Sequence, residues 1–437
     1  MRETGFELYM DWLEDTESPL TFHRWSFVAT ISTLLSRQLV FGADTALETY
    51  ANQYITLVGP PASRKNTALR YTKKLLQAVD FNKFASDRSS KEKFIMDMQE
   101  GFSDDIEDIL DLDITPNHEA LIYAPELQDF LGQGNMDFIS FLTNMWDMPD
   151  SYQHRLKNSK SSKLTNPTIN MVGGATTSTL AEIFPESIGG TGFLSRTLLV
   201  YGKGARKKIT FPEPPCGDKE RMLIELLVAI KNNARGHATM TKGAREMLDV
   251  IYKGWQPLPD VRLETYSGRR FTSLIKNCMV VACSDLSFTK TGVLITEDHV
   301  LYANSMLCFI EGFMPRALGK LGSSKSLELQ NKISGVLEAS EVGLSFSELN
   351  KRMTSAIENI HQLAEALKIM QKLGKVIPDP KNGVFYAGDT GPRKNLHCDY
   401  GLLKEGIEYY ADLELHGNEQ DEEEDLVDQM YRKDLLS

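Results

Sequence analysis

Apolar positions near the start of the chain predict two helices, a hairpin and a buried strand. Apolar residues recur at helical spacing over 6–37, and Ser18-Pro19 interrupts that pattern. Residues 38–51 have the pattern of a short hairpin, and the run 53–58 is typical of a core strand. A helix is expected at about 65–79. The order strand, turn, helix is that of a phosphate-loop unit.

The next segment alternates further strands with helical stretches. Strands are predicted at 120–124, 165–174 and 197–201. The acidic stretch 97–113 has the pattern of a solvated helix face, so we assign it no catalytic role. Alternation at this spacing favours a mainly parallel α/β sheet.

The remaining pattern is helical up to about residue 373. Helices are predicted at 218–233, 241–254, 268–285 and 296–315, then at 326–339, 345–353 and 355–373. Short strands at 375–377 and 384–386 complete the outline of a winged helix. We therefore expect five regions: a helical module with hairpin at 1–50, a core at 51–215, a helical lid at 216–320, a winged helix at 326–388 and a polar, acidic tail at 389–437.

The charge is concentrated at the end of the chain. Of the formal net charge of −12 over 437 residues, residues 419–437 carry eight acids against Arg432 and Lys433. We expect part of this tail to be disordered and to serve as a contact for a replication partner. The total charge does not exclude nucleic-acid binding, which depends on a local basic stripe.

The five cysteines indicate a reducing compartment, because they are odd in number and widely spread, and lack CxxC spacing. A structural zinc site is not expected. The first residues contain no apolar signal core, and no run approaches the roughly 18 apolar residues of a membrane helix. A cytoplasmic protein without a membrane contact is the expectation.

Residues 59–67 resemble a phosphate loop with two departures. The usual pattern is Gly, four residues, Gly-Lys and then Ser or Thr. Gly59 and Lys65 hold their places, Arg64 replaces the second glycine, and Asn66 replaces the hydroxyl residue. Backbone N–H groups and the lysine of such a loop bind ATP phosphates, while Thr67 or Asn66 would contact Mg²⁺. The loop set is Gly59, Pro60, Pro61, Ala62, Ser63, Arg64, Lys65, Asn66 and Thr67.

Arg64 adds a cation beside the phosphates but lacks the conformational freedom of glycine. The alternative for the whole segment is a strand-to-helix turn with a chance lysine.

Two polar residues follow predicted strands and are candidates for catalysis. Glu126 could orient the attacking water, although Pro125 stands where an aspartate usually helps to hold the metal. The alternative is an acid at a helix N-terminus. Thr176, with Thr177 as its rival, could touch the terminal phosphate or the water, and the alternative is a helix cap.

Arginines at two further places could stabilise phosphate charge. A glycine-rich turn at 189–192 precedes Arg196, which could reach a phosphate on a neighbouring subunit. A surface ion pair is the alternative. Arg269 and Arg270 begin an apolar helix and could sense phosphate in the same subunit, and solvated arginines would have the same pattern.

The segment 150–163 concentrates cations in an otherwise acidic chain. It has no acid after Asp150 and is rich in Ser and Asn. This pattern favours a hairpin tip that follows a nucleic-acid backbone, and a solvated flexible loop is the alternative. The residues concerned are His154, Arg155, Lys157, Lys160 and Lys163.

These motifs together resemble a family of P-loop ATPases from phages and mobile elements that is related to primase–helicases and catalogued mainly as a domain of unknown function. The resemblance covers about residues 8–205 and rests on Phe-His-Arg-Trp-Ser around Trp25, Leu-Val-Gly-Pro-Pro-Ala-Ser-Arg-Lys-Asn-Thr, Pro-Glu-Leu at 125–127, Asn-Pro-Thr-Ile-Asn-Met-Val-Gly-Gly-Ala-Thr at 166–176, and Gly-Phe-Leu-Ser-Arg at 192–196. It implies that Arg64 is a family trait.

A more distant resemblance is to AAA+ helicases of the minichromosome-maintenance and superfamily-3 kinds. Leu194-Ser195-Arg196 is similar to their arginine finger, and 150–165 to their basic hairpin. The segments starting at Arg269 and at Thr296-Glu297-Asp298 are similar to their lid, which favours Arg269 as the lid sensor. Thr176 stands where those families carry Asn.

The resemblances imply an α/β fold with an AAA+-like P-loop NTPase core and a hexameric ATP- and Mg²⁺-dependent helicase. Such a ring would translocate on single-stranded or forked DNA during phage or mobile-element replication, in the host cytoplasm if the chain is phage-encoded. Two alternatives remain: an ATP-dependent DNA-binding initiator or helicase loader without unwinding activity, and a non-enzymatic replication scaffold with a decayed loop. No primase chemistry is visible in the sequence.

Overall fold

A four-stranded parallel sheet organises the centre of this mixed α/β protein. In the computed structural model its strands lie in the order β4-β7-β3-β8. They are β3 (Tyr54–Val58), β4 (Glu119–Ala124), β7 (Thr168–Ala175) and β8 (Thr197–Tyr201). The structure describes residues 4–101, 117–154, 162–184, 192–258, 260–319, 325–338, 340, 343–357, 359–388, 392 and 396–416. The predicted parallel α/β sheet is confirmed.

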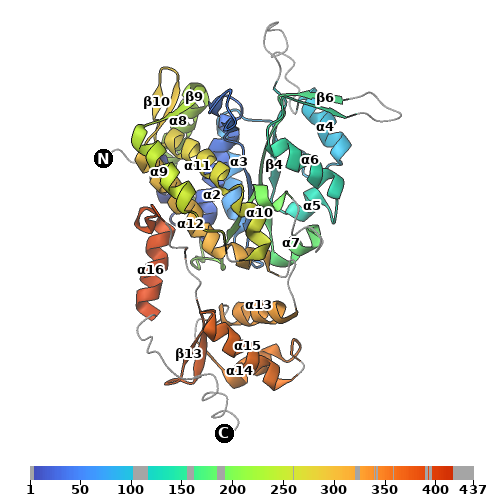
Figure 1. Ribbon diagram of the computed structural model, residues 1–437, viewed down its shortest axis with the longest axis vertical. Coiled ribbons are helices and arrows are strands. Elements are labelled where there is room, and N and C mark those ends of the chain that lie inside the picture. The colour runs from blue at the N-terminus through green and yellow to red at the C-terminus, as the bar shows by residue number, and fades with distance from the viewer. Residues whose placement is uncertain are drawn as a thin grey trace.

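Helices cover both sides of this sheet, as Figure 1 shows, with α2 and α3 on one side and α5 and α6 on the other. Every residue of α2 is buried, so this helix forms the centre of the apolar core. A capping box between Thr4 and Glu7 starts α1. The helices before β8 are α1 (Gly5–Trp12), α2 (Leu20–Leu35), α3 (Lys65–Ala78), α4 (Lys91–Glu100), α5 (Leu127–Leu131), α6 (Met136–Trp146) and α7 (Thr177–Ile183).

A second sheet joins the N-terminal hairpin to the lid region. Its order is β10-β11-β9-β1-β2, and β1 pairs in parallel with β9. The strands are β1 (Leu39–Phe41), β2 (Thr49–Tyr50), β9 (Gly236–Met240), β10 (Phe288–Thr289) and β11 (Gly292–Ile295). The four helices expected between 218 and 315 are present, but strands β9, β10 and β11, which were not expected, lie in the gaps between them. The expected regions 1–50 and 216–320 share one sheet.

The lid helices were otherwise predicted closely. They are α8 (Gly217–Asn233), α9 (Lys242–Gly254), α10 (Glu264–Ser267), α11 (Arg270–Ser284) and α12 (Glu297–Leu318), with 3₁₀ turns at Val261–Leu263 and, before β8, at Leu194–Arg196. Helix α12 contacts α11 and strand β8, which connects the helices after residue 216 to the central sheet.

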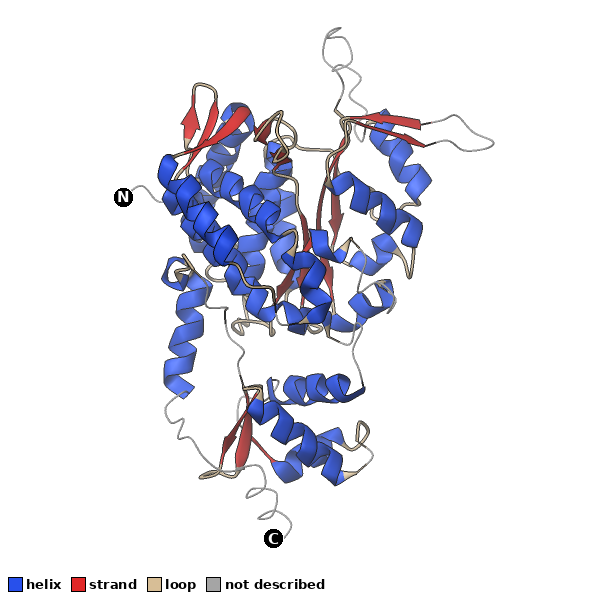
Figure 2. Cartoon of the chain, in the orientation of Figure 1, coloured by secondary structure: helices blue, strands red, loops and turns tan. Residues whose placement is uncertain are grey.

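Residues 325–388 form a small unit with an apolar core of its own. Its elements are α13 (Lys325–Glu338), β12 (Leu344–Ser345), α14 (Phe346–Met353), α15 (Ile360–Lys372), β13 (Val376–Asp379) and β14 (Val384–Ala387). The strands form an antiparallel sheet in the order β12-β14-β13. Figure 2 shows this unit set apart from the larger body. Glu338 connects the two, since it accepts from the Tyr201 hydroxyl at 3.3 Å and pairs with Arg316 at 3.4 Å.

The chain returns to the larger body after the small unit. A 3₁₀ turn (Tyr400–Leu402) leads into α16 (Lys404–His416), drawn in red in Figure 1. Glu405 of α16 forms a buried ion pair with Arg24 of α2. The expected tail at 389–437 is thus wrong for this part, because α16 is docked by a buried contact. Residues 417–437, with the acidic run, lie outside the described residues.

None of the helices in the described ranges combines the length and the apolar character that crossing a membrane requires.

Candidate nucleotide site

The loop between β3 and α3 holds Lys65 at the first position of the helix. Its Nζ donates to the carbonyl oxygens of Gly59 at 3.0 Å and Pro60 at 3.1 Å, and to Ser63 Oγ at 3.2 Å. Lys65 is 7% exposed, and burial lowers the pKa of Lys65, while the charge of Glu126 acts in the opposite direction. The lysine therefore folds back over its own loop and lies within electrostatic range of Glu126.

Arg64 adopts the left-handed backbone conformation that a glycine would usually provide. Its φ is 62° and its ψ 27°, and Ala62 is also left-handed with a φ of 64°. A non-glycine residue in this region costs about 1–2 kcal/mol. The Arg64 side chain forms an ion pair with Glu17 at 2.6 Å, and Ser18 Oγ donates to the Arg64 carbonyl at 3.2 Å. Contrary to expectation, the Arg64 cation pairs with the N-terminal module.

The backbone of this loop fits a phosphate group. Within the described residues, the N–H groups of Arg64, Lys65 and Asn66 donate to no other group. Consecutive free N–H groups beside left-handed residues at a helix N-terminus form an anion-binding concavity. A Cβ on Gly59 would lie 2.7 Å from both the Gly202 carbonyl oxygen and Ser63 Oγ, so the turn requires glycine.

The side chains beside Lys65 leave the metal contact open. Asn66 is exposed and Thr67 is half-buried, and both lie in the first turn of α3. An amide oxygen and a hydroxyl are both hard ligands that suit Mg²⁺. Either residue fits the ion, so the choice between Thr67 and Asn66 stays a prediction.

Glu126 and Thr176 lie at the same edge of the sheet as the loop. Glu126 follows β4 after Pro125 and has an exposed side chain. Thr176 follows β7, which lies between β4 and β3. The Gly59 N–H donates to the Ala175 carbonyl at 3.2 Å, so the end of β7 touches the loop. Carboxyl ends of parallel strands are where open α/β sheets bind ligands.

The Thr176 hydroxyl has a capping contact. Its Oγ1 accepts from the Thr179 N–H at 3.0 Å and lies 2.8 Å from Ser178 Oγ. Thr176 is thus the N-cap residue of α7. This is the helix cap considered as the alternative for this residue. A hydroxyl has two lone pairs and one proton, and the Thr179 N–H, Ser178 Oγ and Thr179 Oγ1, the last at 3.0 Å, take up all three. Its role toward phosphate stays a prediction.

Arg196 lies just before β8 begins, at the N-terminal ends of the strands, whereas the Lys65 loop lies at their C-terminal ends. Thr197 pairs with Tyr54 at the start of β3, whereas Tyr201 pairs with Val58 at the phosphate-loop end. Four residue steps along a strand separate the two edges by about 13 Å. Arg196 therefore lies at the far end of the sheet from the Lys65 loop of its own chain.

The Arg196 guanidinium is held by three neighbours. Nη1 donates to the Gly192 carbonyl at 2.8 Å, Nη2 pairs with Asp147, and the guanidinium carbon lies 5.6 Å from the Trp146 ring centroid. A Cβ on Gly192 would lie 2.7 Å from Nη1. The glycine-rich turn thus leaves room for the guanidinium.

Arg269 joins this second cluster. Its Nη1 lies 3.3 Å from Asp147 Oδ1 and its guanidinium carbon 5.7 Å from the Trp146 ring centroid. The expectation that Arg269 senses phosphate in the same subunit is corrected, because Asp147 holds it beside Arg196. The buried Lys276 lies over the same ring at 3.8 Å and donates to the carbonyl oxygen of Asn52 at 2.8 Å.

Sequence reasoning missed Trp146 and Asp147 at the end of α6 and Lys276 in α11, because the two helices are far apart in the sequence and these residues match no motif.

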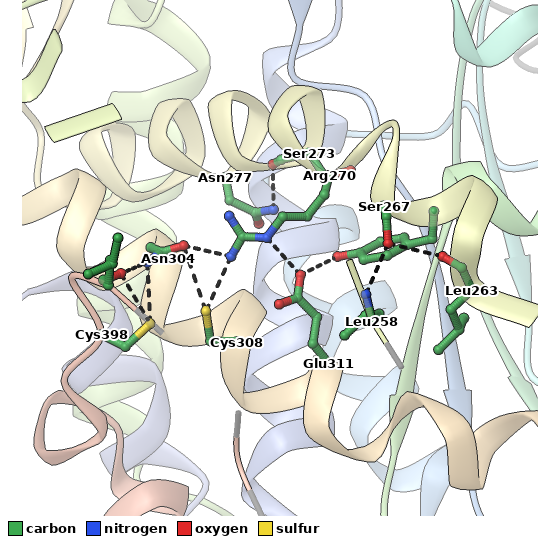
Figure 3. Close-up of polar contacts among 12 residues, drawn as sticks. Leu258, Leu263, Ser267, Arg270, Ser273, Asn277, Asn304, Cys308, Glu311 and Cys398 are labelled. Carbon is green, nitrogen blue, oxygen red and sulfur yellow. Dashed lines mark hydrogen bonds and ion pairs between the residues drawn. The ribbon is translucent and has the colours of Figure 1, made fainter. Parts of the chain in front are cut away.

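Arg270 has a structural position instead of a ligand-facing one. Figure 3 shows its guanidinium between Glu311 and Asn304. Nε donates to Glu311 Oε1 at 2.9 Å and Nη2 to Asn304 Oδ1 at 2.6 Å, and Trp255 covers the guanidinium at 4.0 Å. The proposed phosphate contact of Arg270 is therefore corrected, since the side chain is buried and ion-paired between α11 and α12.

The basic hairpin is described only in part. Its strands are β5 (Ser151–His154) and β6 (Ser162–Thr165), which pair antiparallel. Lys163 is exposed on β6, and His154 ends β5. Arg155, Lys157 and Lys160 lie outside the described residues.

Comparisons with known proteins leave the function to be argued from this geometry. Neither a scan against protein-family models nor a search of curated proteins finds a match. In the described ranges, His, Cys, Asp and Glu side chains form no group of three suited to a metal ion.

Proposed function

We propose that the chain is a ring-forming ATPase with an AAA+-like arrangement, in which 51–215 is the P-loop core, 216–320 the lid and 326–388 a winged helix. The observation that carries the proposal is the division of charged groups between the two edges of one sheet. Lys65 and Glu126 lie at one edge, and Arg196 and Arg269 lie at the other. One copy cannot bring the two sets together, whereas neighbouring copies in a ring can.

At the loop edge, the residues divide the work on a bound nucleotide. The free N–H groups of residues 64–66 and the Lys65 ammonium would bind phosphate oxygens. Glu126, exposed and within electrostatic range of Lys65, would orient a water molecule, with Thr176 beside it. ATP would supply the transferable phosphoryl group, and Thr67 or Asn66 would hold an Mg²⁺ ion that neutralises phosphate charge.

At the opposite edge, Arg196 and Arg269 would act on the nucleotide of the neighbouring subunit. Planar guanidinium groups match phosphate oxygens and keep their charge at every physiological pH. Arginines supplied from a second chain accelerate phosphoryl transfer by about 10³–10⁵-fold in related chemistry. Hydrolysis would then depend on assembly, because each site takes residues from two chains.

The substrate would be single-stranded or forked DNA, gripped by the basic hairpin. Lys163 and His154 border the segment that contains Arg155, Lys157 and Lys160. A cation-rich tip suits backbone phosphates without sequence preference. On this proposal the chain would act in replication of a phage or mobile element as a hexameric helicase in the host cytoplasm, and the acidic residues 419–437 would contact a replication partner.

The decisive experiment measures unwinding of a forked duplex with Mg²⁺ and ATP. Arg196→Ala and Lys65→Ala are each expected to abolish unwinding, and a mixture of the two is expected to recover part of it. Arg221→Ala, which removes an exposed arginine paired with Asp218, is the matched control and should keep full activity. If Arg196→Ala unwinds like the wild type, the shared-site proposal is wrong.

An initiator or helicase loader remains the second candidate because of Pro125. Without an aspartate there, Glu126 is the acid that follows β4, and hydrolysis is expected to be slow. ATP-dependent binding to forked DNA without strand separation would select this alternative. Unchanged nucleotide binding by Lys65→Ala would instead support a non-enzymatic scaffold.

A further inference from the structure

Asp147 is the carboxylate at which the two arginines of the second cluster meet. It caps the C-terminus of α6, directly after Trp146. Arg196 Nη2 pairs with Oδ2 and Arg269 Nη1 with Oδ1, so each carboxylate oxygen takes one guanidinium. Both guanidinium groups also lie over the Trp146 ring. One anion and one aromatic face therefore contact both cations, and the Gly192 carbonyl holds Arg196 in addition.

The cluster has more positive than negative charge. Two arginines, which do not lose their protons, share a single carboxylate among the described residues. The Arg196 side chain is 8% exposed, and its Nε is buried and has no hydrogen-bond partner within the described residues. Burial, and next the neighbouring Arg196, lower the pKa of Arg269, which indicates that the cations repel each other. Such a site attracts a second anion.

The site is open where the anion sits. The Asp147 side chain is 47% exposed, whereas Trp146 beneath the cations is buried. A phosphate group can thus approach from solvent on the side of the carboxylate. Phosphate presents three acceptor oxygens and more negative charge than a carboxylate, and it matches guanidinium groups in the same two-pronged way.

We infer that Asp147 is an internal anion that holds Arg196 and Arg269 in register and competes with a phosphate group for them. Asp147 is a positioning residue, since it acts through the arginines. The identification of that phosphate as the terminal group of a nucleotide on the neighbouring subunit rests on the proposed function. The existence of an anion site in which Asp147 competes with the ligand does not rest on that function.

The first test uses pyrophosphate and the Lys65→Ala protein, in which the phosphate loop is disabled. Titration is followed by intrinsic fluorescence, because Trp146 lies directly under both cations; Trp146→Phe identifies its signal. Adding Asp147→Asn removes the competing charge with little change of shape and should tighten pyrophosphate binding about tenfold, which is about 1.4 kcal/mol. Asp147→Glu should stay near the wild-type affinity, and Arg196→Ala should abolish the signal.

Unchanged or weaker pyrophosphate binding by folded Asp147→Asn protein overturns the inference. If circular dichroism shows that this variant is unfolded, the inference is tested by the pyrophosphate titration of the Lys65→Ala protein without the Asp147 substitution. A Trp146 signal that saturates with pyrophosphate and disappears in Arg196→Ala supports the site, and no signal overturns it. Neither result depends on ATP hydrolysis, so a failure of this inference can be distinguished from a failure of the proposed ATPase function.

A second test separates the sources of the phosphate. Lys65→Ala/Asp147→Asn subunits are mixed with Arg196→Ala subunits loaded with a non-hydrolysable ATP analogue, and association is measured by sedimentation. Association about tenfold tighter than with Lys65→Ala alone supports the neighbouring nucleotide as the ligand. Tighter pyrophosphate binding without tighter association overturns that assignment and leaves free phosphate as the ligand.

Discussion

Replacing Glu405 by Gln should release α16 from the body of the protein. Arg24 Nε donates to Glu405 Oε1 at 2.5 Å and Nη2 to Oε2 at 2.7 Å, and the two side chains are 2% and 7% exposed. Removing one member of a buried ion pair costs about 3–5 kcal/mol, because the other charge stays desolvated. Gln retains one acceptor oxygen, so we expect about 3 kcal/mol.

The loss of stability in Glu405→Gln is limited because α16 can undock while the rest of the protein stays folded. If α16 undocks, water can reach Arg24, so the loss should appear as local opening of α16 before global unfolding. Hydrogen exchange of the α16 amides measures this opening directly. A loss of about 3 kcal/mol corresponds to exchange faster by about 100-fold.

Two variants control the interpretation. Glu408→Gln, also in α16, breaks the pair between the half-exposed Glu408 and Arg206 of the loop after β8, and should cost less than about 1 kcal/mol. The double variant Arg24→Met/Glu405→Leu removes both charges and should restore most of the protection. Exchange in Glu405→Gln within threefold of the wild type would refute the reasoning.

Two further predictions concern His23 and Gly192. Burial, with a smaller contribution from Arg206, lowers the pKa of His23 to about 3 from 6.5, so below pH 6.5 the unfolded chain binds a proton that the folded chain refuses. The free energy of unfolding should therefore fall by about 2–3 kcal/mol between pH 7 and 4.5. Urea denaturation at several pH values measures this pH dependence, and His23→Gln should lose it. If His23→Gln keeps the same pH dependence, the assignment to His23 is wrong. Gly192→Ala should displace the Arg196 guanidinium and abolish the proposed unwinding with normal circular dichroism, whereas Gly204→Ala, with open space around its Cβ position, should behave like the wild type in the same assay.

The main elements could be predicted because their patterns are long. Strands β3, β4 and β8 and helices α3, α11 and α12 lie within a few residues of the positions expected from apolar periodicity. Parallel pairing followed from the alternation of strands with helices. Strands β9, β10 and β11 were missed, since two to five residues give too little periodicity to distinguish them from a loop.

The residues of the candidate site also fall into two groups: those placed by local sequence could be predicted, and those placed by tertiary packing could not. Lys65 and Glu126 were found because each follows a core strand, and local sequence fixes such positions. Asp147 and Lys276 were not found, since their meeting at Trp146 depends on how α6 and α11 pack. Arg270 was misjudged for the corresponding reason: Glu311, which neutralises it, is 41 residues away in the sequence.

The parallel pairing of β1 with β9 determines how this protein can be dissected. Strand β1 precedes the phosphate loop in the chain and β9 follows β8, yet the two exchange backbone hydrogen bonds in one sheet. A fragment trimmed to residues 51–215 would leave both strands behind and uncover the apolar surface that α2 and α12 bury. Any motion of β9, β10 and β11 as a unit would also carry β1 and β2, because the five strands belong to one sheet.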